Sequence, residues 1–397
     1  MGKKFYIVDN VCTPYKLILH RISNYLVAND WLPVSSLMEA DVAIVGTCGA
    51  FHSLANESLE YIKEAREAVE ELVVFGCLPN ILPEKVKAFK PDRIIPSPRW
   101  EEFEKLVEEP AISINDAQEA NEFRLKEEYR LYDPGKKFVL IQTGCSSDCP
   151  YCPHKLGIGD LRSRPFDKIL CQVQKLTQAG AHTIILHGND TGSYGTDIGR
   201  TYPELLKEVM KVSPKLHLTQ LNADWVYKYR QELFDLAMDE KVKDFQVLIQ
   251  TSSSRLLELM ERQPVVKKLK SFLKKIRNNK RNIVFRTDVI IGYPTATEAE
   301  EMETLEFVTE LFDEVAVHGF ERFPHTRIEK MGLPFYSQEI INERVKIALE
   351  FLKQYPTLLV HRGGQVYQTL VDIEELKEQM RSFKSAEQFC YPEQCNN

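Results

Sequence analysis

Three cysteines stand close together in the middle of the chain, in the segment Cys145-Ser-Ser-Asp-Cys149-Pro-Tyr-Cys152. These central cysteines suit one iron–sulfur cluster, with each thiolate bound to a different iron. The fourth iron then lacks a nearby protein ligand and can chelate a substrate or cofactor, as an open zinc site does. The alternative is a structural zinc ion with His154 as the fourth ligand, although zinc sites usually combine two well-separated pairs of ligands.

Three further cysteines, Cys12, Cys48 and Cys77, are distant in sequence but share one feature. Each of these N-terminal cysteines follows a segment that predicts a buried strand by one to three residues. Because the carboxyl ends of parallel strands lie along one edge of a sheet, we expect the three thiols to converge on one crevice. Each cysteine alone is more often a small buried side chain. Together they again offer three ligands for a cluster with an open fourth iron.

The composition is that of an ordinary globular protein, with 43% hydrophobic and 27% charged residues among 397. No apolar run approaches the ~18 residues that span a bilayer, and the N-terminus lacks the pattern of a secretory signal, so we expect a cytoplasmic protein. In that reducing compartment the nine cysteines, an odd number, favour metal binding or thiol chemistry over disulfides. The net charge of −7 argues weakly against a broad nucleic-acid-binding surface.

Alternating strand and helix patterns divide the chain into four segments. We expect an N-terminal domain at 1–107, a polar linker at 108–135, a second domain at 136–354 and a short C-terminal segment at 355–397. In both domains apolar strands alternate with helices, which indicates an α/β fold with parallel sheets covered on both faces. The second domain carries six such β/α units, which suggest an open or partial (β/α)6 barrel with its site at the carboxyl ends of the strands.

The expected strands are short apolar runs between polar segments. In the N-terminal domain they lie at 4–9, 41–46, 72–76 and 92–97. In the second domain they lie at 137–142, 183–187, 216–221, 245–249, 283–292 and 314–320, and 363–373 could add one or two more. The helix at 53–72 is predicted to begin with Ser53 as its N-cap. Cys171 is expected in the core, and Cys390 and Cys395 are expected to be free thiols.

The motif CxxxCxxC after a strand, in a run of β/α units, resembles that of the radical S-adenosylmethionine (SAM) enzymes. The N-terminal cysteines narrow the resemblance to the methylthiotransferases, whose first domain carries one cysteine near residue ten, one in a TC motif and one in a GC motif. Here these read Cys12, Thr47-Cys48 and Gly76-Cys77. Four later segments are also similar to family motifs, and the likeness covers about residues 4–335: GDLRSRP at 159–165, HGNDTGSYGTD at 187–197, IQTSSSRLLELMERQ at 249–263 and TDVIIGYPTATEAEEMETLEFV at 287–308.

This resemblance implies two [4Fe–4S] clusters, SAM as a cofactor and a reductant such as flavodoxin or ferredoxin. The cluster on the central cysteines would bind SAM, whose one-electron cleavage gives a 5′-deoxyadenosyl radical that takes a hydrogen from an unreactive carbon. The cluster on the N-terminal cysteines would hold the sulfur that is methylated and then transferred. The resemblance implies no catalytic side chain beyond the cluster ligands and no membrane partner. The protein would position cofactor and substrate and exclude side reactions.

The resemblance also implies a set of SAM contacts. One aromatic ring would lie beside the cluster and the adenine, one strand-end segment would meet the methionine moiety, and two polar residues of later strands complete the set. Each could instead be a hydrogen-bonded polar group at a strand end. Tyr151 would be the ring beside the cluster and the adenine. Gly188, Asn189 and Asp190 would form the strand-end segment, and Gln250 and Arg286 would be the two polar residues of later strands.

The sequence departs from the family pattern beside both cysteine sets. Pro153-His154-Lys155 follows the central cysteines where the family often has Ile-Val-Pro, and Tyr15 stands where the family has an asparagine. Both changes face the substrate side by inference, so they leave the chemistry intact and the substrate identity open. Arg162 and Arg164 could pair with acids or with the cofactor carboxylate. The family's C-terminal β-barrel, which grips RNA or protein, is expected to be incomplete after Gly364.

The substrate classes known for the family are a tRNA adenosine and a ribosomal-protein aspartate. The GDL sequence at 159–161, the DTGSYGTD run and the net acidity favour a peptide or protein substrate. The opposing feature is a basic stretch without acids from Arg262 to Arg286, whose lysines could contact phosphate. A solvated helix face is the more common explanation, so we favour a peptide or protein over tRNA. The alternative from another class is a non-catalytic iron–sulfur or zinc protein that binds a partner.

Overall fold

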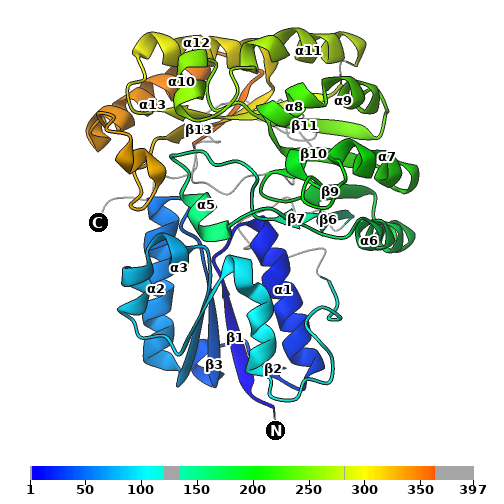
Figure 1. Cartoon of the computed structure of the whole chain (residues 1–397), viewed down its shortest axis with the longest axis vertical. Helices are drawn as coiled ribbons and strands as arrows, with labels where there is room; N and C mark the ends of the chain where they lie inside the picture. The colour runs from blue at the N-terminus through cyan, green and yellow to red at the C-terminus, as the bar shows by residue number, and fades with distance from the viewer. Residues whose placement is uncertain (1, 120–134, 281, 363–397) are drawn as a thin grey trace.

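The computed structural model describes residues 2–119, 135–280 and 282–362 and contains two parallel β-sheets with helices packed on them (Figure 1). The N-terminal sheet has the strand order β2-β1-β3-β4-β5. In open α/β sheets of this order, ligands bind outside the carboxyl ends of β1 and β3. The strands are β1 Lys4–Asp9, β2 Leu32–Pro33, β3 Val42–Thr47, β4 Glu71–Gly76 and β5 Arg93–Pro96, and the helices are α1 Thr13–Ala28, η1 Leu37–Glu39, α2 His52–Ala68, α3 Leu78–Ile81, α4 Pro83–Lys87 and η2 Ser97–Leu106.

The two central strands of the N-terminal sheet, β3 and β4, are apolar on both faces. Ile44 and Phe75 belong to the core on the side of α1 and η2, whereas Val45 and Val74 belong to the core on the side of α2 and α4. Successive residues of a strand point to opposite faces, so an uninterrupted apolar run fits a strand with helices on both sides. The four strands predicted for this domain are confirmed, and the short β2 is an addition.

The second sheet has seven parallel strands in the order β6-β9-β10-β11-β12-β13-β14, so β6 and β14 are its outermost strands among the described residues. All six predicted strands are present, and the α/β fold class with parallel sheets is confirmed. The seventh strand, β14 (Leu359–Arg362), pairs with β13 and extends the sheet past residue 354, where the sequence predicts the end of the domain. A short antiparallel ribbon, β7 with β8, follows β6.

The elements of the second domain alternate regularly. Its other strands are β6 Lys136–Leu140, β7 Gln142–Thr143, β8 Arg162–Ser163, β9 Thr183–His187, β10 Leu216–Asn222, β11 Val242–Leu248, β12 Val284–Ile291 and β13 Glu314–Gly319. Its helices are α5 Pro153–Ile158, α6 Phe166–Gln178, η3 Thr191–Ser193, α7 Tyr202–Val212, α8 Ala223–Lys228, α9 Arg230–Ala237, α10 Ser254–Leu259, α11 Val266–Asn279, α12 Glu298–Leu311, η4 Arg327–Lys330 and α13 Gln338–Leu352. Among the residues described, no helix is both long and apolar enough to cross a membrane.

Two predictions about helices are wrong. Helix α2 begins at His52, and its N-cap is Phe51, not Ser53, without a side-chain capping bond. Cys171 is exposed on α6 and not in the core. The buried face of α6 carries Ile169 and its neighbours in the helical repeat, and residue 171 lies about 200° around the helix from 169. The segment 363–373, Cys390, Cys395 and the expected incomplete barrel lie outside the described residues.

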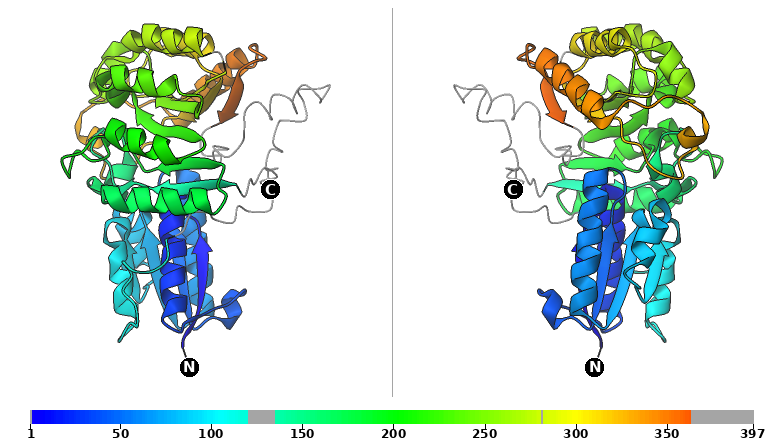
Figure 2. Two further views of the ribbon diagram at one scale, coloured as in Figure 1. Left: turned by 90° about the vertical axis from the view of Figure 1, so that its right-hand side faces the viewer. Right: turned by 90° about the vertical axis from the view of Figure 1, so that its left-hand side faces the viewer.

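The carboxyl edge of the N-terminal sheet faces the second domain. Figure 1 shows this sheet (blue) below the second one with α5 between them, and the side views of Figure 2 show the same order. His52, at the start of α2, stacks on Phe323 with the ring centroids 4.2 Å apart, and its backbone N–H donates to Glu321 at 2.6 Å. Arg162 of β8 donates to Glu101 of η2 at 2.5 Å, so of the two partners that the sequence leaves open for it, the structure shows an acid.

Candidate iron–sulfur site

The N-terminal cysteines follow three adjacent strands. Thr47, the last residue of β3, is paired with Gly76, the last residue of β4, so Cys48 and Cys77 leave the sheet side by side. Cys12 follows the neighbouring strand β1 and precedes α1. The structure therefore brings these three residues to one edge of the sheet, and their role as ligands stays a prediction.

The N-terminal thiols lie close enough to alter one another's acidity. A hydrogen bond between Cys77 and Cys48 holds the pKa of the Cys48 thiol well below its ordinary value and raises the pKa of Cys77. Burial, followed by the nearby Cys48, raises the pKa of Cys12. The Gly49 N–H donates to Cys77 Sγ at 3.0 Å. Adjacent buried thiols of this kind fit a cluster, because metal binding replaces their protons.

The central cysteines occupy a loop that folds back on itself beside the second sheet. The N–H of Cys145 donates to the Gly159 carbonyl at 3.3 Å, and the N–H of Cys152 donates to the Cys149 carbonyl at 3.1 Å. Burial raises the pKa of Cys145 to about 12, with Asp190 as the second cause. Burial also raises the pKa of Cys152 to about 11, with Cys149 as the second cause. These neighbouring thiols could likewise bind one cluster.

Within the described residues, no three side chains of His, Cys, Asp or Glu converge as the ligands of a single metal ion would. Cluster ligands need no such convergence, because each of them binds a different iron. His154, the candidate fourth ligand of a zinc ion, lies toward the other cysteine set. The lowered pKa of Cys48 arises chiefly from Cys77, and a hydrogen bond with the His154 side chain adds to it.

Two of the predicted SAM contacts lie at the carboxyl end of β9, beside the central cysteines. Asp190 is fully buried, accepts a hydrogen bond from Trp225 Nε1 at 3.0 Å, and lies 3.9 Å from Cys145 Sγ. Burial raises the pKa of Asp190. The Oδ1 atoms of Asp190 and Asn189 are buried and have no hydrogen-bond partner in the described part of the chain. Such acceptors fit a polar ligand, because buried polar atoms rarely remain unpaired.

Two further observations complete this part of the site. A Cβ on Gly188 would lie 2.5 Å from Gln142 Cγ, so only glycine fits at the end of β9. Tyr151 packs edge-on against Tyr293, with the ring centroids 5.6 Å apart. The structure thus brings Tyr151, Gly188 and the two residues after it to the loop of the central cysteines.

Arg262 also lies in this region and is not among the site residues that the sequence predicts. It donates to Asn222 Oδ1 at 2.8 Å and to the Leu248 carbonyl at 3.3 Å. Burial would lower its pKa, but Tyr151 and Cys149 beside it raise the pKa above the ordinary value. A half-buried cation beside the loop of the central cysteines can pair with a carboxylate. The signal in the sequence is the final Arg262-Gln263 of the family-like segment at 249–263.

The last two predicted contacts are placed differently. Gln250 follows β11, has a φ of 64°, and its N–H donates to the Asp288 carbonyl of β12 at 2.9 Å. Arg286 is the third residue of β12, where it pairs with Asp244 at 2.5 Å and Glu314 at 3.2 Å. It therefore lies away from the carboxyl ends of the strands, and this placement does not favour a SAM contact.

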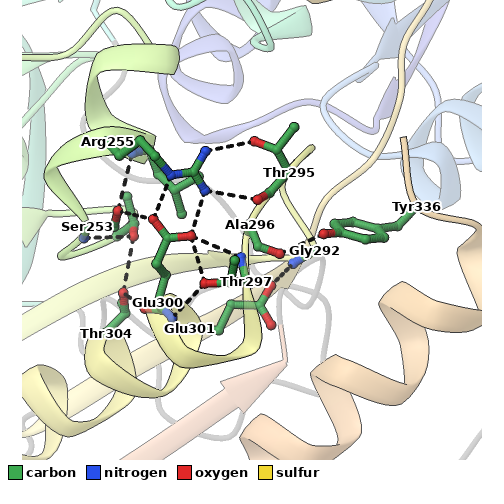
Figure 3. A network of polar contacts seen from close by, with 12 residues as sticks. Ser253, Arg255, Gly292, Thr295, Ala296, Thr297, Glu300, Glu301, Thr304 and Tyr336 are labelled. Atoms are coloured by element: carbon green, nitrogen blue, oxygen red, sulfur yellow. Dashed lines mark hydrogen bonds and ion pairs between the residues drawn. The ribbon is translucent and has the colours of Figure 1, made fainter. Parts of the chain in front are cut away.

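A polar network holds the loop after β12 in place (Figure 3). Arg255 pairs with Glu300 at 2.6 Å and donates to the Thr295 carbonyl at 2.9 Å. Glu300 also accepts from the N–H of Thr297, the N-cap of α12, in a reciprocal capping box. The hydrogen bond from Arg255 is the main reason that the pKa of Glu300 falls to about 2. The network therefore fixes the loop after β12, at the carboxyl ends of the strands of the second sheet.

One apolar cluster, which we call the seam, joins the two cysteine sets. Gly157 of α5 packs against Cys77 so closely that a Cβ at residue 157 would overlap Cys77 Cβ and lie 2.9 Å from its Cα. Helix α5, which follows the central cysteines, thus forms a wall of the N-terminal site. The seam contains the N-terminal cysteines with Val11, Tyr15, Ile81, Cys145, Ile158 and Phe323.

The basic stretch forms α11, which packs beside the acidic helix α12. Four cations of α11 pair with acids of α12 or of the residues after it. Lys267 pairs with Glu303 at 2.5 Å, Lys270 and Lys274 share Glu310, and Arg277 pairs with Asp313 at 2.6 Å. Lys275 lies over the Phe234 ring at 4.1 Å. Much of the positive charge is therefore balanced within the chain.

Two sequence-family models match different parts of the chain. The sequence model of the radical SAM superfamily matches residues 139–308, and that of the uncharacterized protein family UPF0004 matches residues 4–95. A probable threonylcarbamoyladenosine tRNA methylthiotransferase of Methanocaldococcus jannaschii is 30% identical over 329 residues, which cover 80% of this chain and 75% of the relative. The ribosomal protein uS12 methylthiotransferase RimO of Thermotoga maritima is 30% identical over 355 residues, which cover 85% and 78%.

A solved structure shares the fold at low sequence identity. The radical S-adenosylmethionine methyltransferase TsrM of Kitasatospora setae has a TM-score of 0.63 at 13% identity, with 89% of each chain covered. This likeness concerns the fold alone, whereas the relatives at 30% identity share most of their length with this chain. The chain therefore belongs to the radical SAM methylthiotransferase family.

Proposed function

We propose that this transferase replaces a C–H hydrogen by a methylthio group on a peptide or protein. The family uses SAM and two [4Fe–4S] clusters, which we assign to the central cysteines and to the N-terminal cysteines. The observation that carries the assignment is the seam, in which Cys145 of the central set packs into the same apolar cluster as the three N-terminal cysteines. When bound, the reduced cluster and SAM supply the one-electron chemistry that removes hydrogen from an unreactive carbon.

In this proposal the chain's own groups hold SAM beside the central cysteines. The unpartnered oxygens of Asn189 and Asp190 suit the donors of an ammonium or hydroxyl group. The guanidinium of Arg262 suits a carboxylate. Fixed contacts of this kind contribute to rate by holding the reacting atoms in one geometry.

The preference for a peptide or protein rests on charge. Helix α11 carries the longest basic stretch, and its cations already pair with acids of α12 or cover aromatic rings. A tRNA-binding face would instead present unpaired cations to phosphates. The relatives include enzymes named for ribosomal protein uS12 and others named for tRNA, so tRNA is the second candidate.

The test is anaerobic incubation of the reconstituted protein with SAM, a reductant such as flavodoxin or ferredoxin, and either ribosomal protein uS12 or total tRNA. We expect mass spectrometry to find a methylthio group on the polypeptide and none on the tRNA. A methylthio group found on the tRNA alone would make tRNA, the second candidate, the proposed substrate. Deoxyadenosine without any methylthio product on either substrate would contradict the proposed transfer.

A further inference from the structure

Two side chains that depart from the family pattern, Tyr15 and His154, lie at the seam. Tyr15 is on α1, three residues after Cys12, and His154 is on α5, two residues after Cys152. The two residues therefore reach the N-terminal cysteines from different domains. The inference that follows rests on the proposed function, because it concerns the cluster assigned to those cysteines.

Tyr15 places a buried hydroxyl among the N-terminal thiols. The side chain is 1% exposed, and burial raises its pKa well above the ordinary value, with Cys12 and Cys77 as the next causes. Ser97 and the N–H of Gly144 face the same hydroxyl and act in the opposite direction. The hydroxyl completes no hydrogen bond within the described residues. Groups that donate toward its oxygen leave its own proton available for an acceptor.

His154 is positioned by the packing of α5. Residues three apart lie on the same face of a helix, so His154 faces the same way as Gly157, which contacts Cys77. Cys48 lies beside Cys77, and the His154 side chain reaches it. The Nε2 atom of His154 is buried and lacks a partner in the part of the chain that the structure describes.

A cluster on three thiolates would place negative charge in an apolar site, and buried charge needs hydrogen-bond donors. The backbone already provides one such donor, Gly49 N–H to Cys77. We infer that the Tyr15 hydroxyl and the His154 imidazole donate hydrogen bonds to the sulfurs of this cluster and thereby set its reduction potential. Both act as positioning residues. Because donors favour the more negative, reduced cluster, their loss makes the potential more negative.

The test is an anaerobic redox titration of the two-cluster holoprotein, followed by electron paramagnetic resonance. The signal of the N-terminal cluster is identified as the one that remains when the central cysteines are replaced by Ala. The variants are Tyr15→Phe, which removes one oxygen, and His154→Leu, which removes the donor, with His154→Gln as the conservative variant that keeps an N–H. Iron content and thermal unfolding are measured on every variant.

Two control variants separate hydrogen bonding to the cluster from packing. Tyr25→Phe changes a buried tyrosine of the same helix, whose hydroxyl donates to the Glu104 carbonyl at 3.1 Å. His52→Gln changes a histidine between the two domains that bonds the Arg322 carbonyl at 3.0 Å. Both side chains bond to backbone carbonyl groups and not to a cysteine in the part of the chain that the structure describes.

We expect a more negative potential in Tyr15→Phe and His154→Leu, a larger shift in the double variant, partial recovery in His154→Gln and no shift in the controls. An unchanged potential in both single variants with full iron content would overturn the inference, and so would equal shifts in the controls. A failure of the proposed function is distinguishable, because it appears in the wild-type protein as a missing methylthio product and leaves the comparison of potentials among the variants intact.

Discussion

Gly157 of the second domain lies directly on Cys77 of the N-terminal sheet, with no space for a side chain between them. Three residues before Gly157 stands His154, and five residues before it stands Cys152. The helix that follows one cysteine set therefore also forms a wall of the site for the other. A substitution at residue 157 should thus act on the cysteines of the opposite domain.

Gly157→Ala should separate the two domains locally, because the added methyl group overlaps Cys77. Overpacking of this kind costs about 1–3 kcal/mol. We expect a lower melting temperature and the loss of about half of the iron, as for one of two clusters. Gly180→Ala is the control, since its φ of 93° strains the backbone but nothing lies within 4 Å. Full iron in Gly157→Ala would contradict the shared wall.

Replacing the central cysteines, Cys145, Cys149 and Cys152, by Ala should remove about half of the iron and all formation of deoxyadenosine. The N-terminal cluster should remain, because its ligands come from a different sheet. Iron analysis and chromatography of the SAM products measure both effects. Deoxyadenosine from this triple variant would disprove the assignment of the SAM-binding cluster.

The reverse variant replaces Cys12, Cys48 and Cys77 by Ala. Reductive cleavage of SAM should continue, since the central cysteines are intact, whereas methylthio transfer should stop. The measurement is mass spectrometry of the substrate beside the yield of deoxyadenosine. A methylthiolated product from this variant would exclude the N-terminal cysteines from sulfur transfer.

Neutralising four lysines of α11, Lys267, Lys268, Lys274 and Lys275, should leave turnover nearly unchanged. Exposed ion pairs such as Lys267–Glu303 contribute at most about 1 kcal/mol to stability. Turnover and tRNA affinity are measured together at physiological salt. A large loss of turnover that follows lost tRNA binding would make tRNA the first substrate to test.

The network of Figure 3 should give the protein an acid-sensitive step. The pKa of Glu300 is lowered from 4.5 to about 2, chiefly by Arg255. Its stabilising contribution is therefore present above about pH 4.5 and is lost as the pH falls toward 2. In Glu300→Gln the melting temperature should fall less over this interval. Glu298→Gln, at a more exposed carboxylate of the same helix turn, is the control and should retain the wild-type slope.

The meeting of the N-terminal cysteines could be predicted because it depends on few facts. Three apolar runs predict three strands, and parallel strands place the residues that follow them along one edge. This prediction does not depend on the exact pairing of Thr47 with Gly76. The central cysteines were simpler still, since their spacing in sequence already brings them together.

Other features depend on packing that the sequence pattern does not contain. Arg286 lies in a predicted strand, but only the register of the strands, which sets it opposite Glu314 and within reach of Asp244, shows that its charge is balanced within the sheet. Whether Cys171 is buried depends on the rotational position of the buried face of α6, which the apolar pattern predicts only roughly. The contact of Gly157 with Cys77 joins two domains, and no local pattern predicts it.

The closed seam has a consequence for the maturation of the protein. Cys48 and Cys77 are 2% and 3% exposed, and α5 covers Cys77. A protein that delivers iron and sulfide cannot reach thiols that are covered in this way. If these cysteines hold a cluster, it must therefore be inserted before the two domains dock, or while they are transiently apart, so the packing of a single glycine would set the order of assembly.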